Sequence, residues 1–128
     1  MSRGFVLDTG ALIALENPAK QRRFAALLDG LGEQGSLVIS AGCLAETWRG
    51  GPRQAPLALL LRRPATTVAE ITAPVAKAIG AFLGHRSDGD DIVDAHVVML
   101  ARHHGLAVIT SDPADLRAID PKLCLTEI

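Results

Sequence analysis

The sequence predicts an α/β protein whose mainly parallel sheet is covered by helices on both faces. Short apolar runs alternate along the chain with segments of helical spacing. The runs are continuous, as in strands buried on two faces, and do not alternate with polar residues. The length of 128 residues suits one domain, and 48% hydrophobic against 21% charged residues indicates a folded core.

The first part of the chain predicts two strands separated by two helices. The apolar run 4–7 is long enough for one buried strand. Helical character follows over 11–15 and ends at Asn17-Pro18, because proline disfavours helix in the residue before it. Apolar residues recur at helical spacing over 22–31, and a second buried strand is expected over 37–39.

The middle of the chain predicts three helices and one strand. Ser40 is a suitable N-cap for a helix over 41–48, and a glycine pair followed by proline interrupts the chain soon afterwards. A helix over 55–61 precedes a strand expected over 66–68. A further helix over 73–83 follows, with a proline in its first turn.

The last third predicts a long helix between a polar loop and a strand. The loop over 84–89 leads into a helix from about 90 to 104, and Gly105 stands where a C-cap glycine belongs. The chain then continues with a strand over 106–109, a short helix over 113–117 and a fifth strand over 124–126.

The net charge is close to zero but unevenly distributed. Thirteen Lys and Arg stand against 14 Asp and Glu, a balance of −1 that argues against coating of nucleic acid by bulk positive charge. Residues 1–63 carry eight basic and five acidic side chains, whereas residues 64–128 carry five basic and nine acidic ones. Such an asymmetry marks an interaction surface or reflects solvated helix faces.

Two further features bear on where the protein works. Cys43 and Cys124 lie far apart in apolar runs, which favours two reduced, partly buried thiols over a disulfide. No run reaches the roughly 18–20 apolar residues that span a bilayer. The N-terminus has no signal-peptide pattern. We therefore expect a cytoplasmic protein without membrane segments.

Several carboxylates are predicted to gather at one edge of the sheet. Asp8 directly follows the first strand, Asp112 follows the fourth by two residues, and Glu46 lies in the helix after the second. Asp91 and Asp94 are three apart near the start of the long helix, so they share one helix face. In open parallel sheets, ligands bind beyond the carboxyl ends of the strands.

Each of these carboxylates also has a purely structural interpretation. Asp8 and Asp112 could cap helices, Asp91 and Asp94 could complement a helix N-terminus, and Glu46 could be an exposed helix residue.

Together, however, they favour a metal site. Asp94 stands in an otherwise apolar stretch and needs a partner if it is buried. Carboxylates at one place repel unless a cation neutralises them, and hard oxygen ligands select Mg²⁺ or Mn²⁺. Such ions activate water for displacement at phosphorus, so phosphate chemistry is expected.

Other chemistries fit less well. The chain has no dinucleotide-binding glycine motif and no P-loop, and its cysteines and histidines lack zinc spacing. His96 is two residues past Asp94 and is interpreted as a structural histidine. A haloacid-dehalogenase-like phosphatase would need Asp-x-Asp after the first strand, where Gly10 occupies the third position.

Two segments of the chain also carry a family resemblance. One is Asp8-Thr-Gly-Ala-Leu-Ile-Ala-Leu, which follows the first strand. In the block from Asp94 to Asp112 an acidic residue opens a helix, a glycine ends it, and a strand leads to Thr-x-Asp. Both segments, with Glu46 between them, resemble PIN-domain ribonucleases, especially VapC-type toxins of toxin–antitoxin modules. The resemblance covers essentially the whole chain.

The resemblance implies a single PIN domain over 1–128, with a PIN-like three-layer sandwich around a mainly parallel sheet of four to five strands. It also implies a Mg²⁺- or Mn²⁺-dependent endoribonuclease that forms a homodimer and is inhibited by a cognate antitoxin. By motif position, the catalytic and metal-binding residues would be Asp8, Glu46, Asp94 and Asp112. Accessory positions would be Thr9, Asp91, Thr110 and Asp115.

Two points go beyond the signature. RNA phosphates or an acidic antitoxin segment could bind the arginines of the first half, Arg22, Arg23, Arg49 and Arg53. The alternative function is a PIN-like module that binds protein or RNA without catalysis, although all four acidic positions are filled.

Overall fold

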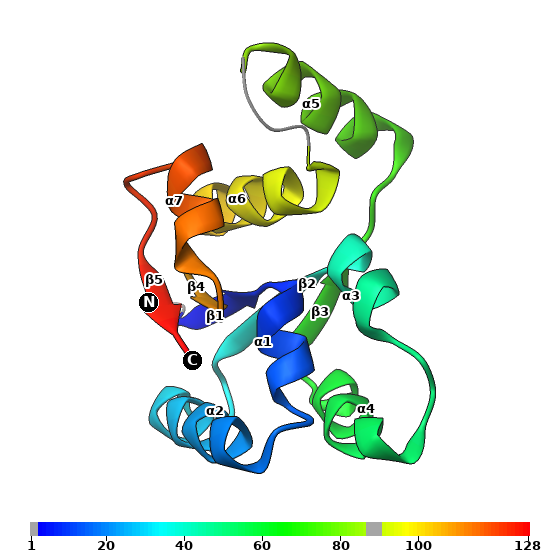
Figure 1. The fold of residues 1–128 in the computed structure, drawn as a ribbon, viewed down its shortest axis with the longest axis vertical. Coiled ribbons are helices and arrows are strands. Elements are labelled where there is room, and N and C mark those ends of the chain that lie inside the picture. The colour runs from blue at the N-terminus through cyan, green and yellow to red at the C-terminus, as the bar shows by residue number, and fades with distance from the viewer. Residues whose placement is uncertain (1–2, 87–90) are drawn as a thin grey trace.

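A five-stranded, fully parallel sheet forms the centre of the computed structural model, which describes residues 3–86 and 91–128 (Figure 1). The strands lie in the order β3-β2-β1-β4-β5. Their bounds are Gly4–Leu7 for β1, Ser36–Ser40 for β2, Thr66–Ala69 for β3, Ala107–Thr110 for β4 and Leu125–Glu127 for β5. The predicted α/β class and sheet are therefore confirmed.

Helices cover both faces of this sheet and complete three layers. Figure 1 shows α6 and α7 on one side of the sheet and α1, α2 and α4 on the other, with α5 packed outside α6. The helices are α1 (Thr9–Ala14), α2 (Pro18–Leu31), α3 (Ala41–Thr47), α4 (Ala55–Arg62), α5 (Ala73–Gly84), α6 (Ile92–His104) and α7 (Pro113–Ile119), with a short 3₁₀ helix η1 (Pro52–Gln54) before α4. No helix within the described ranges is both long and apolar enough to cross a membrane.

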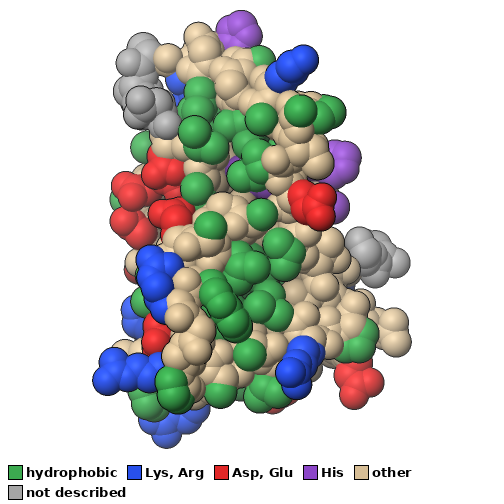
Figure 2. All heavy atoms as spheres, turned by 90° about the vertical axis from the view of Figure 1, so that its right-hand side faces the viewer, with side chains coloured by type: hydrophobic (Ala, Val, Ile, Leu, Met, Phe, Trp, Pro, Cys, Tyr) green, Lys and Arg blue, Asp and Glu red, His purple; other side chains and the backbone are tan. Residues whose placement is uncertain are grey.

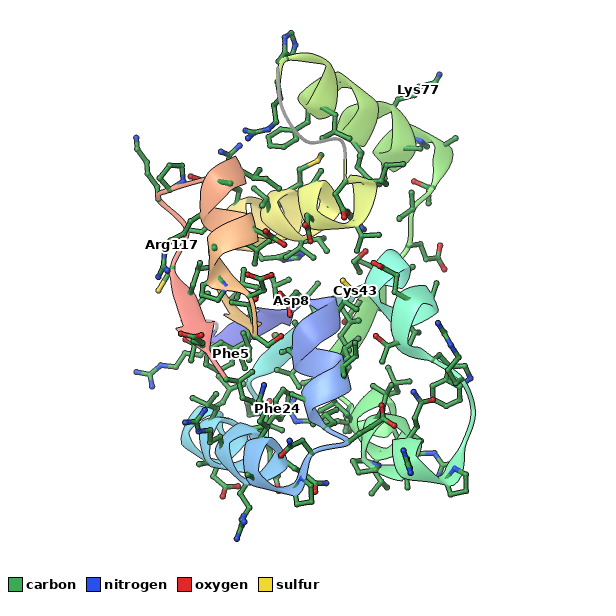
Figure 3. The ribbon with its side chains drawn as sticks, in the orientation of Figure 1. Phe5, Asp8, Phe24, Cys43, Lys77 and Arg117 are labelled. Carbon is green, nitrogen blue, oxygen red and sulfur yellow. The ribbon has the colours of Figure 1, made fainter. Side chains whose placement is uncertain are left out.

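The core lies where the central strands meet the helices. Leu37, Ile39 and Ile109 are fully buried in the inner strands. Phe24 of α2 adds the largest fully buried side chain to the core (Figure 3). Burial on two faces explains why these strands read as continuous apolar runs.

Three helices begin at other residues than the sequence predicted, and the first, α1, begins at Thr9, two residues early. The α2 helix begins at Pro18, four residues before the predicted start, because the Asn17 side chain accepts from the Ala19 and Lys20 amides and proline fits the first helical position. The α6 helix begins at Ile92, after an N-cap at Asp91. The predicted start at residue 90 lies outside the described residues, as do residues 87–89 of the predicted loop before it.

The segment after α3 is held by one buried side chain. Oε1 of Gln54 accepts from the amides of Arg49 and Gly50 at 2.7 and 2.9 Å, while its Nε2 donates to the Thr47 carbonyl at 2.7 Å. Gly50 has a positive φ of 78°, which a side chain would disfavour. These bonds end α3 at Thr47 and fix the turn that follows the glutamate-bearing helix.

Strand β1 lies at the centre of the sheet, where the order in which strands are added reverses: β2 and β3 extend the sheet on one side, and β4 and β5 on the other. It pairs with β2 on one side and with β4 on the other. The connections that leave and return to this centre therefore diverge at the carboxyl ends of β1 and β4. In doubly wound folds, a crevice opens at such a point.

Candidate functional site

An acidic pocket of about 200 Å³ lies at the carboxyl ends of β1 and β4. Acidic side chains also gather at one edge of the face that Figure 2 shows. The residues that line the acidic pocket are Asp8, Thr9, Gly10, Glu46, Asp91, Asp94, Ser111, Asp112, Asp115 and Leu116. The structure thus brings together the four predicted catalytic carboxylates and three of the four accessory residues, from the end of β1, α1, α3, the start of α6, the β4–α7 connection and α7.

Asp8 is the most enclosed carboxylate of the acidic pocket, 7% exposed. It is the N-cap of α1, where its Oδ1 accepts from the Ala11 amide at 2.9 Å. Burial raises the pKa of Asp8, and the Asp112 charge raises it further, while hydrogen bonds from the Thr110 hydroxyl and the Ala11 amide oppose the rise. The capping interpretation is therefore correct, and Asp8 lines the acidic pocket as well.

Asp94 comes from the first turn of α6. Its amide donates to Oδ1 of Asp91 at 2.9 Å, so Asp91 is the N-cap of α6, near the start of the helix as expected. Burial, together with the charges of Asp91, Asp115, Asp8 and Glu46, raises the pKa of Asp94 to about 6. All of these charged neighbours are carboxylates.

The connection after β4 and the first turn of α7 supply the third group of acids. Asp112 occupies the N-cap position of α7 without a side-chain capping bond, so the predicted capping alternative fails for this residue. Its amide donates to Oγ1 of the fully buried Thr110 at 2.9 Å. The Asp112 charge and a hydrogen bond with Asp112 raise the pKa of Asp115. The Thr110 hydroxyl therefore connects two of the pocket's acidic residues, because it accepts from the Asp112 amide and also bonds to the Asp8 side chain.

Glu46 reaches the acidic pocket from α3 as an exposed residue. The Thr9 hydroxyl donates to its Oε1 at 3.3 Å and connects α3 to the start of α1. Glu46 is an exposed helix residue, as the structural interpretation predicted, and it also lines the acidic pocket.

Ser111 was missed by the sequence analysis, although it lines the acidic pocket. A Cβ atom on Gly10 would overlap the Ser111 hydroxyl, so the glycine lets α1 approach the β4–α7 connection closely. Its position in the sequence between Thr110 and Asp112, two predicted site residues, could have identified it.

The four arginines predicted to contact RNA or antitoxin do not line the acidic pocket. Arg22 and Arg23 lie exposed on α2, and Arg53 lies exposed in η1. The Arg49 guanidinium folds back on α3, where it donates to the carbonyls of Ala45 and Trp48 at 3.3 and 2.7 Å.

His96 and the cysteines are not pocket residues. His96 is 2% exposed, its Nδ1 lies 2.6 Å from Oγ of Ser40, and burial lowers its pKa. Both cysteines are free thiols, as expected. Cys43 is buried behind the pocket near Asp8 (Figure 3), and burial raises its pKa to about 12. Cys124 is exposed, in contrast to its predicted partial burial.

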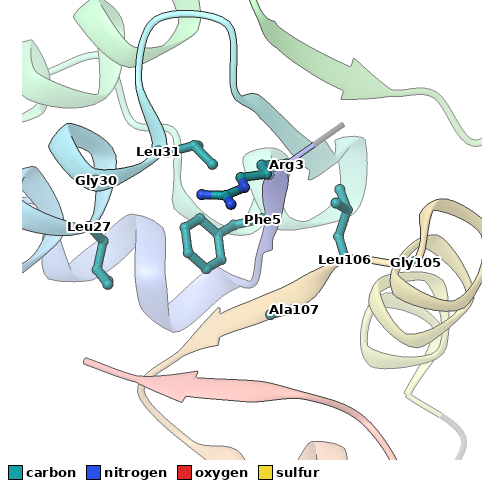
Figure 4. Close-up of a pocket in the computed structure, with 9 residues that line it drawn as sticks. Arg3, Phe5, Leu27, Gly30, Leu31, Gly105, Leu106 and Ala107 are labelled. Atoms are coloured by element: carbon teal, nitrogen blue, oxygen red, sulfur yellow. The ribbon is translucent and has the colours of Figure 1, made fainter. Parts of the chain in front are cut away.

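A second pocket, of about 370 Å³, lies at the opposite end of the sheet (Figure 4). Its residues come from the amino ends of β1 and β4 and from α2, and they include Arg3, Phe5, Leu31 and Leu106. It contains no carboxylate and no nucleophilic side chain, so the acidic pocket is the better candidate for chemistry.

The family can now be assigned. The sequence matches the family model for the PIN domain over residues 5–121. The chain belongs to the PIN-domain family. The family resemblance seen in the two signature segments is thereby confirmed. No curated protein matches the sequence.

Solved structures share the fold of this PIN domain. The Mycobacterium tuberculosis toxin VapC20, described as cleaving the sarcin-ricin loop, is 21% identical with a TM-score of 0.69, over 91% of this chain and 95% of that one. VapBC2 of Rickettsia felis, solved bound to a promoter DNA fragment, is 19% identical with a TM-score of 0.65 over 98% of each chain. FitAcB of Neisseria gonorrhoeae is 22% identical with a TM-score of 0.61, over 94% of this chain and 95% of that one.

Proposed function

We propose that this PIN domain is a Mg²⁺- or Mn²⁺-dependent endoribonuclease of the VapC type, the toxin of a toxin–antitoxin module. The observation that carries the proposal is the pocket in which Asp8, Glu46, Asp94 and Asp112 come together at the carboxyl ends of β1 and β4. The family membership and the fold shared with VapC proteins support it.

The donor set of the acidic pocket fits a hard divalent cation. All its ionisable side chains are carboxylates; burial and repulsion by neighbouring acids raise the pKa of Asp94, and the Asp112 charge raises the pKa of Asp115. A divalent cation relieves such repulsion. No three Asp, Glu, His or Cys side chains in the described ranges already form a ligand cluster. The carboxylates would therefore have to turn toward a bound ion. The side chains of Glu46 and Asp112 are exposed and can make this movement.

The roles within the site follow from burial and bonding. Asp8 and Asp94, the more enclosed carboxylates, would be the principal ligands, and Glu46 and Asp112 would complete the set. Thr9 and Thr110 orient Glu46 and Asp8 through their hydroxyls. A bound divalent ion would supply a Lewis acid that activates water for attack on an RNA phosphodiester.

An apolar groove beside the acidic pocket suits the proposed antitoxin. Ala41, Leu44, Ala45, Trp48 and Leu61 line this groove on α3 and α4, and the Trp48 side chain is 43% exposed. Figure 2 shows hydrophobic side chains gathered on this face of the molecule. Because α3 also carries Glu46, an antitoxin segment seated in the groove could continue into the acidic pocket. We also propose that the toxin acts as a homodimer in the cytoplasm.

Cleavage of RNA by purified protein tests the function. A single-stranded RNA should be cut with Mn²⁺ or Mg²⁺ and left intact with EDTA. Asp8→Asn should reduce the rate by at least about 100-fold, since a ligand and its charge are lost. Asp29→Asn, on the exposed surface of α2, is the matched control and should cut normally.

Three outcomes would overturn the assignment. Cleavage that persists in Asp8→Asn would place the chemistry elsewhere. A protein that neither binds Mn²⁺ nor cuts RNA would be the binding-only module considered above. Hydrolysis of a small phosphomonoester in place of RNA would favour the phosphatase alternative.

A further inference from the structure

A buried hydrogen bond joins the end of β2, where α3 begins, to α6. Ser40 and His96 are 0% and 2% exposed, and Oγ of Ser40 lies 2.6 Å from Nδ1 of His96. The two residues are 56 positions apart in the chain, so the bond joins separate elements. A buried polar pair of this kind costs desolvation energy, which the hydrogen bond has to offset.

The Ser40 hydroxyl makes two hydrogen bonds that are compatible with each other. Its oxygen accepts from the Gly42 amide at 3.1 Å and thereby caps α3. Its single proton remains free to donate to an unprotonated Nδ1 of His96. One atom thus fixes the first turn of α3 and connects it to α6.

A second contact fixes the same two helices. A Cβ atom on Gly42 would come within 2.8 Å of Cγ2 of Val93, so the backbone of α3 lies against α6 at this point. Val93 and His96 stand on either side of Asp94 in the sequence. Because α3 is only seven residues long, the position of its first turn sets the position of Glu46.

On this geometry, and resting on the proposed function, we propose that Ser40 and His96 are positioning residues, which hold Glu46 on α3 at the correct distance from Asp94 on α6. Neither residue lines the acidic pocket, so they act through the two carboxylates. Outer partners of metal ligands typically change metal affinity or activity by about 10- to 100-fold when they are removed.

The test compares two substitutions of His96 with a control on the same helix. His96→Leu removes the acceptor at similar volume, whereas His96→Asn places a side-chain polar atom near the position of Nδ1. His103→Leu makes the same change at an exposed residue near the end of α6. Hydrogen exchange of the α3 amides, the Kd for Mn²⁺ and the kcat and KM of RNA cleavage are measured for each.

His96→Leu should speed amide exchange in α3 and weaken Mn²⁺ binding by about 10- to 100-fold, with kcat falling more than KM rises. His96→Asn should recover most of the wild-type protection of the α3 amides and most of the Mn²⁺ affinity, and His103→Leu should match wild type in both. Ser40→Ala should weaken Mn²⁺ binding like His96→Leu, and the double variant should be no worse than either single one.

Unchanged exchange and Mn²⁺ affinity in His96→Leu would overturn the proposal, as would His96→Asn behaving like His96→Leu. If His96→Leu does not fold, Ser40→Ala and His96→Asn still decide. A wild type without Mn²⁺ binding or cleavage would refute the proposed function, whereas the exchange of the α3 amides would still show whether the bond holds that helix.

Discussion

Replacing Asp94 by Asn should stabilise the metal-free protein while abolishing cleavage. Asp94 is surrounded by like charges, and its pKa is raised from 3.8 to about 6. At about 1.4 kcal/mol per pKa unit, this rise corresponds to at most about 3 kcal/mol of unfavourable free energy at neutral pH. Because Asp94 is only half-buried, screening by solvent reduces the figure to about 1 kcal/mol. A domain of this size should then gain about 3–6 °C in Tm.

The pH dependence of this gain follows from the direction of the pKa change. A carboxyl group with a raised pKa binds protons more tightly in the folded than in the unfolded chain, so wild-type stability rises as pH falls from about 6 to about 4. The Tm difference between Asp94→Asn and wild type should therefore be complete at pH 7.5 and shrink to about half at pH 5.

Thermal unfolding in EDTA at these two pH values measures the effect. Mn²⁺ should reverse the order of stability, because a ligand at 100 times its Kd adds about 2.7 kcal/mol to the protein that binds it. An Asp94→Asn protein that is no more stable than wild type at pH 7.5 would refute the idea that burial and charge repulsion destabilise the ionised form of Asp94.

Further predictions concern the packing around the site. Gly10→Ala should destabilise the fold by about 1–3 kcal/mol, measured by urea unfolding, because the added methyl group overlaps the Ser111 hydroxyl; wild-type stability would show that the connection yields. Iodoacetamide at pH 8 should modify Cys124 and spare Cys43 in the native protein, by mass spectrometry, since Cys43 is buried with a pKa of about 12. Rapid labelling of Cys43 would mean that α3 opens readily.

The fold was predictable because its signals are local. Continuous apolar runs such as 4–7 and 106–109 identified buried strands, and Gly105, with φ 65°, ends α6 as expected. The start of α2 was not predicted, because Asn17-Pro18 ends one helix and also begins the next. The same two residues end α1 and begin α2, and the start of α2 is evident only from the hydrogen bonds of the Asn17 side chain.

The candidate site was predictable at the level of residues but not of environment. Strand ends and helix starts brought Asp8, Asp94 and Asp112 to one edge of the sheet. The burial of Asp8 and the raised pKa of Asp94 depend on packing between elements that are distant in the chain, which no local pattern encodes. The bond between Ser40 and His96 was missed for the same reason.

The central place of β1 has a consequence for when activity can arise during synthesis. Asp8 leaves the ribosome well before β4, yet its amide donates to the Ile109 carbonyl, and β1 pairs with β4 in the register Leu7↔Ile109. The acidic pocket therefore cannot assemble on a nascent chain until β4 and the acids that follow it have emerged. A protein proposed to be toxic to its own cell would thus stay harmless up to that stage of translation, and an antitoxin already present would meet the active form as it first appears.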